Sequence, residues 1–243
     1  MRLRNILYIL MVSYVLIGLA IYLDYIYQFG APVQLSIFSQ ADLQLSVNSN
    51  VMYNLFMLFP MMVGTFAFLK EYHQAMQILP YGTKKNIFFK QIKSGVIWSV
   101  ILAVSDTGMT LLSGMMWNKI DINWADANSY FCVVMHKLLP GVSFSEVFLM
   151  NTIALCVKNI LVAFILIISW WAFSNVLYGI LIVTGICFTG QWTPGLSWLL
   201  GSLTDDYNFW IAMSNKIQYG IALVLCLTVF TLLANAVVKR KEF

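Results

Sequence analysis

The chain has 243 residues, of which 60% are hydrophobic and only 10% are charged, and its mean hydropathy is +0.80. A soluble domain carries about 25% charged residues, so this composition excludes a water-soluble globular protein and indicates an integral membrane protein. The formal net charge is +4, but the basic residues adjoin apolar runs, which indicates membrane topology and not nucleic-acid binding. The composition therefore predicts one all-α membrane domain, residues 1–243, that contacts the lipid bilayer.

Six segments are apolar enough to predict transmembrane helices, each of which needs about 20 residues. They are residues 5–23, 51–69, 94–116, 148–172, 175–190 and 217–238. The fifth is short, and its junction with the fourth lies near Phe173, Ser174 and Asn175. One unbroken helix at this junction would leave five spans and reverse the rest of the topology.

The basic residues set the orientation of these spans. With six spans, most Lys and Arg side chains fall on one face: Arg2, Arg4, Lys70, Lys84, Lys85, Lys90, Lys93, Lys239, Arg240 and Lys241. Most of the acidic residues, Asp42 among them, fall on the opposite face. The positive-inside rule then places both termini in the cytoplasm, and we expect a multi-pass protein of a bacterial plasma membrane.

The N-terminal span has a second interpretation, a cleaved signal peptide, because it combines a basic start with an apolar run. The run is longer than a typical signal-peptide core, and no clear cleavage motif of small residues precedes a polar mature start. A retained first span is therefore the preferred interpretation.

Residues 70–93 form a polar, basic segment between the second and third spans. An amphipathic helix is predicted first, from apolar residues at helical spacing: Tyr72, Ala75, Met76 and Leu79. Pro80 and Gly82 then predict a turn, and Thr83 can cap a second helix that leads into the third span. The segment is either a connector whose lysines enforce topology and contact anionic lipid, or a docking surface for a cytoplasmic partner.

This segment resembles the loop after the second span in type-2 export permeases of the ATP-binding cassette transporters. The residues that carry the resemblance are Glu71, Ile78, Leu79, Pro80, Thr83, Lys84, Lys85, Asn86, Ile87 and Lys90. The six-span plan and the basic C-terminus are similar to that family too. The Gly that usually follows the acidic residue there is missing here, where Ala75 or Met76 stands near its place.

The resemblance implies a coupling helix that docks in a groove on a separate ATPase subunit. The implied docking residues are four apolar anchors and a charged rim: Tyr72, Met76, Leu79 and Tyr81, with Lys84 and Lys85. Two permease chains, identical or different, would enclose the path of a hydrophobic or amphipathic substrate, such as a peptide, out of the cell. The chain has no Walker-type Gly-x-x-x-x-Gly-Lys, so we expect ATP and magnesium in the partner, and neither a cofactor nor a catalytic residue in this chain.

The segment Gln191–Ser202, before the last span, resembles the re-entrant external hairpin of the same family. A broken hairpin at the membrane interface is predicted by Trp192, Pro194, Gly195 and Trp198. Such a backbone is tolerated where it is buried in protein or lines a cavity.

Two ionisable residues lie within spans, Asp106 in the third and Lys158 in the fourth. The two spans run in opposite directions, and a rise of about 1.5 Å per residue puts the two side chains at comparable depth. We therefore predict an intramembrane pair, because unpaired charges at this depth are costly. The pair is either a structural link between adjacent spans or a polar patch on the substrate path, and Lys158 could instead extend toward the outer surface.

Two other functions stay open. A membrane-embedded enzyme of lipid metabolism would need clustered acids or histidines, whereas Asp205–Asp206 is a single acidic pair. A non-transporting sensor or assembly partner would leave the basic segment without an ATPase. No metal site is expected, because His73 and His136 fall on opposite faces, and Cys132, Cys156, Cys187 and Cys226 are expected to fill the core without forming disulfides.

Overall fold

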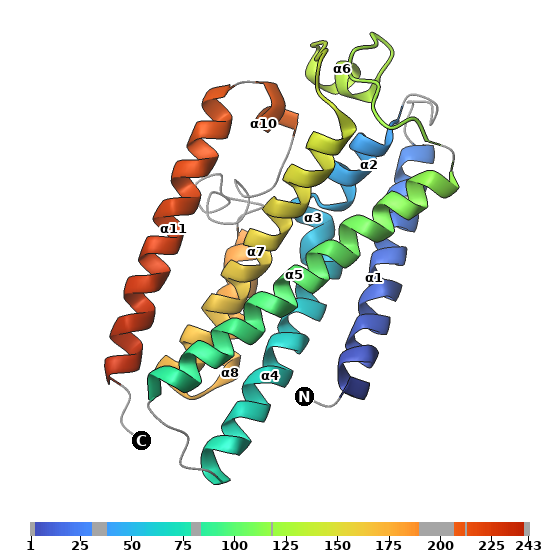
Figure 1. Cartoon of the computed structure of the whole chain (residues 1–243). Helices are drawn as coiled ribbons and strands as arrows, with labels where there is room; N and C mark the ends of the chain where they lie inside the picture. The colour runs from blue at the N-terminus through green and yellow to red at the C-terminus, as the bar shows by residue number, and fades with distance from the viewer. Residues whose placement is uncertain are drawn as a thin grey trace.

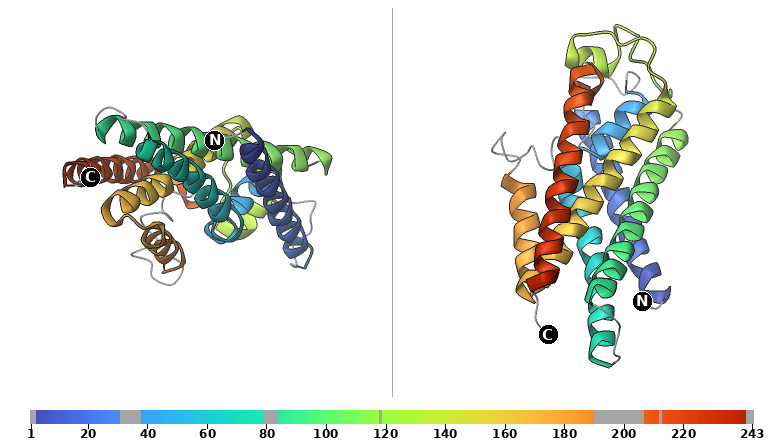
Figure 2. Two further views of the ribbon diagram at one scale, coloured as in Figure 1. Left: turned by 90° about the horizontal axis from the view of Figure 1, so that it is seen from below. Right: turned by 60° about the vertical axis from the view of Figure 1, so that its left-hand side comes forward.

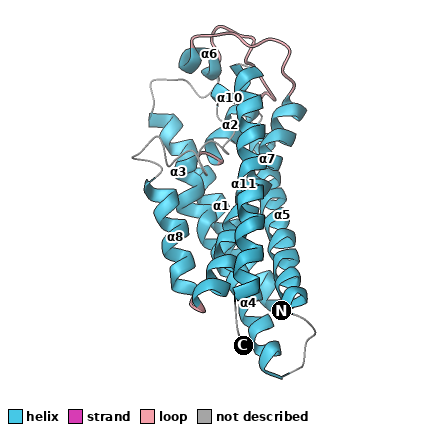
Figure 3. Ribbon diagram, turned by 90° about the vertical axis from the view of Figure 1, so that its left-hand side faces the viewer, coloured by secondary structure: helices cyan, strands magenta, loops and turns pink. Residues whose placement is uncertain are grey.

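The computed structural model is a helical bundle, with no strand in the residues that it describes, 3–30, 38–78, 84–117, 119–189, 207–211 and 213–240 (Figures 1 and 3). The longer helices are α1 (Leu3–Gly30), α4 (Leu58–Ile78), α5 (Lys84–Met116), α7 (Phe144–Phe173), α8 (Val176–Thr189) and α11 (Met213–Arg240). The short ones are α2 (Gln40–Val47), α3 (Asn50–Met52), the π-helix η2 (Tyr53–Met57), α6 (Tyr130–Met135) and α10 (Tyr207–Ile211). The predicted all-α fold class is confirmed, and each predicted span overlaps one of the longer helices.

Two stretches are long and apolar enough to cross a membrane, Lys85–Met116 in α5 and Phe144–Phe173 in α7. Shorter apolar stretches lie in the other long helices: Leu7–Leu23, Tyr53–Leu69, Val176–Cys187 and Val224–Lys239. The number of spans and their orientation in a membrane stay predictions.

The long helices alternate in direction, and both termini lie at one end of the bundle (Figure 1). This end also holds the end of α4 and the beginning of α5, whereas α2, α6 and α10 lie at the other. Seen along the bundle, α1 and α11 lie at opposite edges, with α4, α5 and α7 between them (Figure 2). The basic segment therefore shares one end of the molecule with both termini, as the predicted topology requires.

The predicted break between the fourth and fifth spans is confirmed. Ser174 adopts a left-handed conformation with φ 54°, and its N–H donates to the Trp170 carbonyl at 2.9 Å. A left-handed residue of this kind ends a helix, so the chain reverses from α7 into α8. Gly179 lets α8 lie close to α7, because a Cβ there would be 3.3 Å from both Leu166 Cδ2 and Ser169 Cβ.

The central hydrophobic core brings α4 and α5 close together at a glycine. Trp98 of α5 is only 1% exposed and packs edge-on against Phe68, with ring centroids 6.3 Å apart. Gly64 of α4 faces the Trp98 indole so closely that a Cβ would overlap the ring. The missing side chain at Gly64 therefore makes room for the largest ring of this core.

Gly64→Ala is expected to displace the Trp98 indole and to lower the free energy of unfolding by about 1–3 kcal/mol, because overpacking a core forces side chains from their rotamers. The matched control is Gly108→Ala in α5, where the new Cβ would meet no atom within 4 Å and where alanine should stabilise the helix by about 0.5–1 kcal/mol. Thermal unfolding in detergent, followed with a thiol-reactive dye that reports exposure of the buried Cys187 and Cys226, measures both changes. Equal unfolding midpoints for the two variants would contradict the close contact.

Candidate functional site

The basic segment 70–93, called the elbow below, is built from the end of α4 and the beginning of α5. α4 is continuous from Leu58 to Ile78 and extends beyond its neighbours at this end of the bundle (Figure 1). The prediction of a separate amphipathic helix is therefore wrong. No proline follows Met61 within α4, so no proline interrupts the backbone hydrogen bonds of α4 from there to Ile78. The predicted restart of the helix is confirmed, since α5 begins at Lys84.

The predicted docking residues are only partly described. Tyr72 and Met76 are one turn apart in α4, Lys84 is the first residue of α5, and Lys85 is exposed on its first turn. Leu79 and Tyr81 lie outside the described residues, as do the predicted hairpin residues Trp192, Pro194, Gly195 and Trp198. The docking role of the elbow stays a prediction.

A hydrophobic cluster fastens the elbow to the rest of the bundle. This elbow cluster consists of buried residues from α4, α5, α7 and α11: Leu69, Ile87, Phe88, Ile167, Trp171 and Val238. The rings of Phe88 and Trp171 meet edge to face with centroids 5.4 Å apart, and Trp171 Nε1 donates to Gln91 Oε1 at 2.6 Å. The beginning of α5 is therefore packed directly against α7 and α11.

The predicted polar pair is buried, but the structure does not join its members by a hydrogen bond. Asp106 of α5 is 0% exposed and Lys158 of α7 is 1% exposed. Neither carboxylate oxygen of Asp106 has a hydrogen-bond partner, and Lys158 Nζ lies 3.9 Å from the centroid of the Tyr53 ring. The ring of Tyr53 therefore lies next to the Lys158 ammonium, in the place that the sequence predicts for Asp106.

Uncharged polar residues link the helices around this pair, and the sequence analysis missed them. The π-helix η2 turns the consecutive residues Tyr53 and Asn54 toward the interior. The Tyr53 hydroxyl donates to Asn159 Oδ1 of α7 at 2.7 Å, and Asn54 Nδ2 donates to the Cys187 carbonyl of α8 at 3.0 Å. A detectable signal was present, since Asn54 and Asn159 both interrupt apolar runs.

A second group of hydrogen bonds holds the short helix α2 against α5 and α7. Gln44 Nε2 donates to the Thr107 carbonyl at 3.0 Å. Asn151 Nδ2 donates to the backbone and side-chain oxygens of Gln44, at 3.1 and 3.2 Å. The short helix α2 therefore enters the bundle and does not lie on its surface.

Asp42 lies at the centre of a hydrogen-bond network at the end of the bundle opposite the elbow. Its side chain is completely buried and forms a capping box with Ser39, whose N–H and hydroxyl donate to Oδ2 at 2.9 and 2.7 Å. Trp124 Nε1 and the Tyr207 hydroxyl donate to Oδ1, each at 2.9 Å. One carboxylate thus connects α2, the segment before α6, and α10.

Burial dominates the electrostatics of this carboxylate. Loss of solvation raises the pKa of Asp42 above its ordinary value of 3.8, and the hydrogen bonds from Ser39, Trp124 and Tyr207 act in the opposite direction. Nearby, burial lowers the pKa of Lys119, and the negative charge of Asp42 opposes that change. The sequence assigns Asp42 only to a face of the membrane, because Trp124 and Tyr207 lie far away along the chain.

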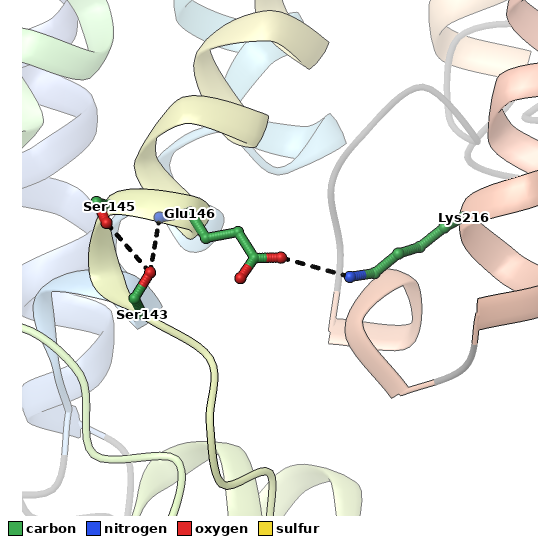
Figure 4. A network of polar contacts seen from close by, with 4 residues as sticks. All are labelled: Ser143, Ser145, Glu146 and Lys216. Atoms are coloured by element: carbon green, nitrogen blue, oxygen red, sulfur yellow. Dashed lines mark hydrogen bonds and ion pairs between the residues drawn. The ribbon is translucent and has the colours of Figure 1, made fainter.

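An exposed contact joins α7 and α11 at the same end (Figure 4). The Ser143 hydroxyl accepts from the Glu146 N–H at 3.3 Å and so caps α7, while Glu146 Oε1 lies 3.7 Å from Lys216 Nζ. Lys216 Nζ also lies 4.8 Å from the centroid of the Trp210 ring. Exposed ion pairs contribute about 0–1 kcal/mol, so this contact orients α11 more than it stabilises it.

Comparison with known proteins finds no matching family model, curated protein or solved structure. Within the described residues, no three or more His, Cys, Asp and Glu side chains gather to hold a metal ion. The four cysteines are free thiols. The resemblance to type-2 export permeases therefore depends on the elbow sequence and on the plan of the helices.

Asp42→Asn is expected to change how stability depends on pH. Because the folded protein holds the Asp42 proton more tightly than the unfolded chain, stability from this group falls as pH rises from 3.8 through the raised pKa. The unfolding midpoint of the Asp42→Asn variant, relative to that of the unaltered protein, should therefore rise with pH. A relative midpoint that falls as pH rises would mean that the four donors keep Asp42 ionised.

A double-mutant cycle of Asp106→Asn and Lys158→Met tests the predicted pair. The Asp106 carboxylate has no hydrogen-bond partner, so no direct hydrogen bond couples the two residues and we expect a coupling free energy below about 1 kcal/mol. Asp106→Asn alone should be close to neutral, because it breaks no hydrogen bond of Asp106. A coupling free energy above about 1 kcal/mol, measured by unfolding in detergent, would restore the direct pair.

Proposed function

We propose that the chain is the membrane-spanning permease subunit of an ATP-binding cassette exporter. The single observation that carries the proposal is the basic elbow, whose described parts, the end of α4 and the beginning of α5, extend from the bundle at the end shared by both termini (Figure 1). Its sequence resembles the coupling loop of type-2 export permeases, and a partner ATPase would dock there. The partner would supply ATP and magnesium.

In this proposal the six long helices cross the plasma membrane, and the elbow and both termini lie in the cytoplasm. The supporting physical argument is the positive-inside rule, since Lys85, Lys90 and Lys93 of α5 are exposed at the elbow end. The opposite end, which contains Asp42 and Trp124, would face the outside of the cell.

Closure of two ATPase subunits would move the elbow as a rigid lever. The elbow cluster supports this role, because it packs the ends of α4, α5, α7 and α11 around Trp171. The lever would then tilt several spans together and change the opening of a path between two permease chains. A hydrophobic or amphipathic substrate, such as a peptide, would leave the cell along that path.

The second permease chain would cover apolar surface that one chain leaves exposed. α1 alone exposes a series of large apolar side chains, among them Leu7, Tyr8, Met11, Val15 and Leu19. Lipid covers the rest of such surface in a membrane protein. The chain can pair with a copy of itself or with a related permease under this proposal.

Purification of the tagged chain from its native cells in mild detergent should recover a polypeptide with a Walker-type ATP-binding sequence, identified by mass spectrometry. Met76→Asp with Leu79→Asp should lower its recovery at least tenfold, because two charges would replace apolar anchors. The matched control is Val133→Asp with Leu138→Asp, two exposed apolar residues far from the elbow, which should leave recovery unchanged.

Unchanged recovery with the elbow variant would remove the coupling role, and absence of any ATP-binding partner from the wild-type preparation would remove the proposed function. A unimodal gel-filtration profile for each variant shows that the permease is still folded. Labelling of a cysteine placed at Thr83 from the outside only would contradict the orientation.

A further inference from the structure

A groove near the elbow end runs between α5, α7 and α11. Its volume is about 350 Å³, within the range of ligand sites. Aromatic and aliphatic side chains form most of its wall, including Phe88 and Phe89 of α5, Phe164 of α7, and Phe230 and Ala234 of α11. The elbow cluster therefore leaves an apolar groove open beside α11.

Two lysines line the same groove from two helices, Lys85 of α5 and Lys239 of α11. Both side chains are exposed, and neither ammonium has a hydrogen-bond or ion-pair partner among the residues that the structure describes. Lys85 belongs to the first turn of α5 and Lys239 to the last turn of α11, so both mark the elbow end of the groove. The groove thus combines an apolar wall with a positive mouth.

The dimensions suit a chain that lies along a helix. From Lys239 to Phe230 the groove follows α11 over nine residues, which corresponds to about 13 Å at the helical rise. Buried methylene groups and lysines near an anionic surface both contribute favourably to the binding of a lipid. A ligand with an anionic head and a hydrocarbon tail would use both parts of the groove.

We propose that this groove binds an anionic phospholipid, with an acyl chain against Phe88, Phe164 and Phe230 and the phosphate at Lys85 and Lys239. The charge of the mouth selects an anionic over a zwitterionic headgroup, and the apolar wall selects a lipid over a free phosphate ion. The inference goes beyond the proposed function, because it needs the bilayer but no ATPase.

The test uses the full chain purified in neutral detergent, with native mass spectrometry as readout. Phosphatidylglycerol is expected to bind more tightly than phosphatidylcholine with the same acyl chains, and inorganic phosphate is expected to leave the bound lipid in place. The unaltered protein should bind long-chain phosphatidylglycerol more tightly than short-chain phosphatidylglycerol. Equal affinity for the two headgroups, or displacement by inorganic phosphate, would overturn the proposal.

Variants locate the lipid. Lys85→Gln with Lys239→Gln should weaken phosphatidylglycerol binding about 30-fold, from about 1 kcal/mol per lysine. The matched control removes two exposed lysines outside the groove, Lys93→Gln with Lys137→Gln, and should change affinity less than about threefold. An equal loss in the control pair would show unspecific attraction to the basic surface and would overturn the site.

Lys239→Gln alone separates this inference from the proposed function, because Lys239 is not one of the predicted docking residues. It should weaken phosphatidylglycerol binding about fivefold and leave recovery of the ATP-binding partner unchanged. Unchanged lipid affinity in this variant would remove Lys239 from the site and overturn the inference, whatever the outcome for the partner.

Discussion

Hydrogen bonds between buried polar side chains link the helices of this apolar bundle, and the arrangement of the helices depends on them. Gln44, Thr107 and Asn151 meet where α2, α5 and α7 converge, while Tyr53 and Asn159 join η2 to α7. Within a membrane such bonds contribute only about 0.6 kcal/mol each, whereas a buried polar group without a partner costs about 1–3 kcal/mol. The bonds therefore select one register of the helices more than they stabilise the bundle. This explains how α2 enters the bundle although Gln40, Asp42 and Gln44 are polar.

Both ends of the molecule contain an apolar cluster, and the end opposite the elbow adds directional hydrogen bonds to a buried carboxylate. At one end, directional hydrogen bonds from Ser39, Trp124 and Tyr207 converge on the carboxylate of Asp42. At the elbow end, apolar side chains pack around Trp171, whose indole N–H donates to Gln91. Hydrogen bonds of fixed geometry resist sliding, whereas apolar contacts allow packed helices to shift by small steps. The elbow end is therefore the end better suited to transmit a movement.

Local signals made much of the fold predictable from sequence. The apolar runs located the long helices, and the residues around Ser174 located the reversal between α7 and α8. The continuity of α4 as far as Ile78 was missed, because amphipathic spacing around Tyr72 predicts a helix but not whether it continues the preceding span.

Long-range contacts were less predictable. Asp42 and Tyr207 lie 165 positions apart in the sequence, and no local pattern indicates that they meet. Asp106 and Lys158, predicted to lie at comparable depth in the membrane from the helical rise, are both buried in the bundle. Their contact partners depend on how each helix is rotated about its own axis, which the sequence does not show. In the structure the ring of Tyr53 lies beside Lys158.

The groove and the elbow cluster share residues, and this overlap connects the two proposals. Phe88, Ile167 and Val238 belong to the elbow cluster and also line the groove. A lipid tail in the groove would pack against the same side chains that would carry a displacement from the elbow to α7 and α11. Because a ligand shifts a conformational equilibrium only through different affinities for the two states, a groove that narrows as the elbow moves would bind the lipid in one state more tightly. The lipid composition of the membrane would then bias the same equilibrium as ATP.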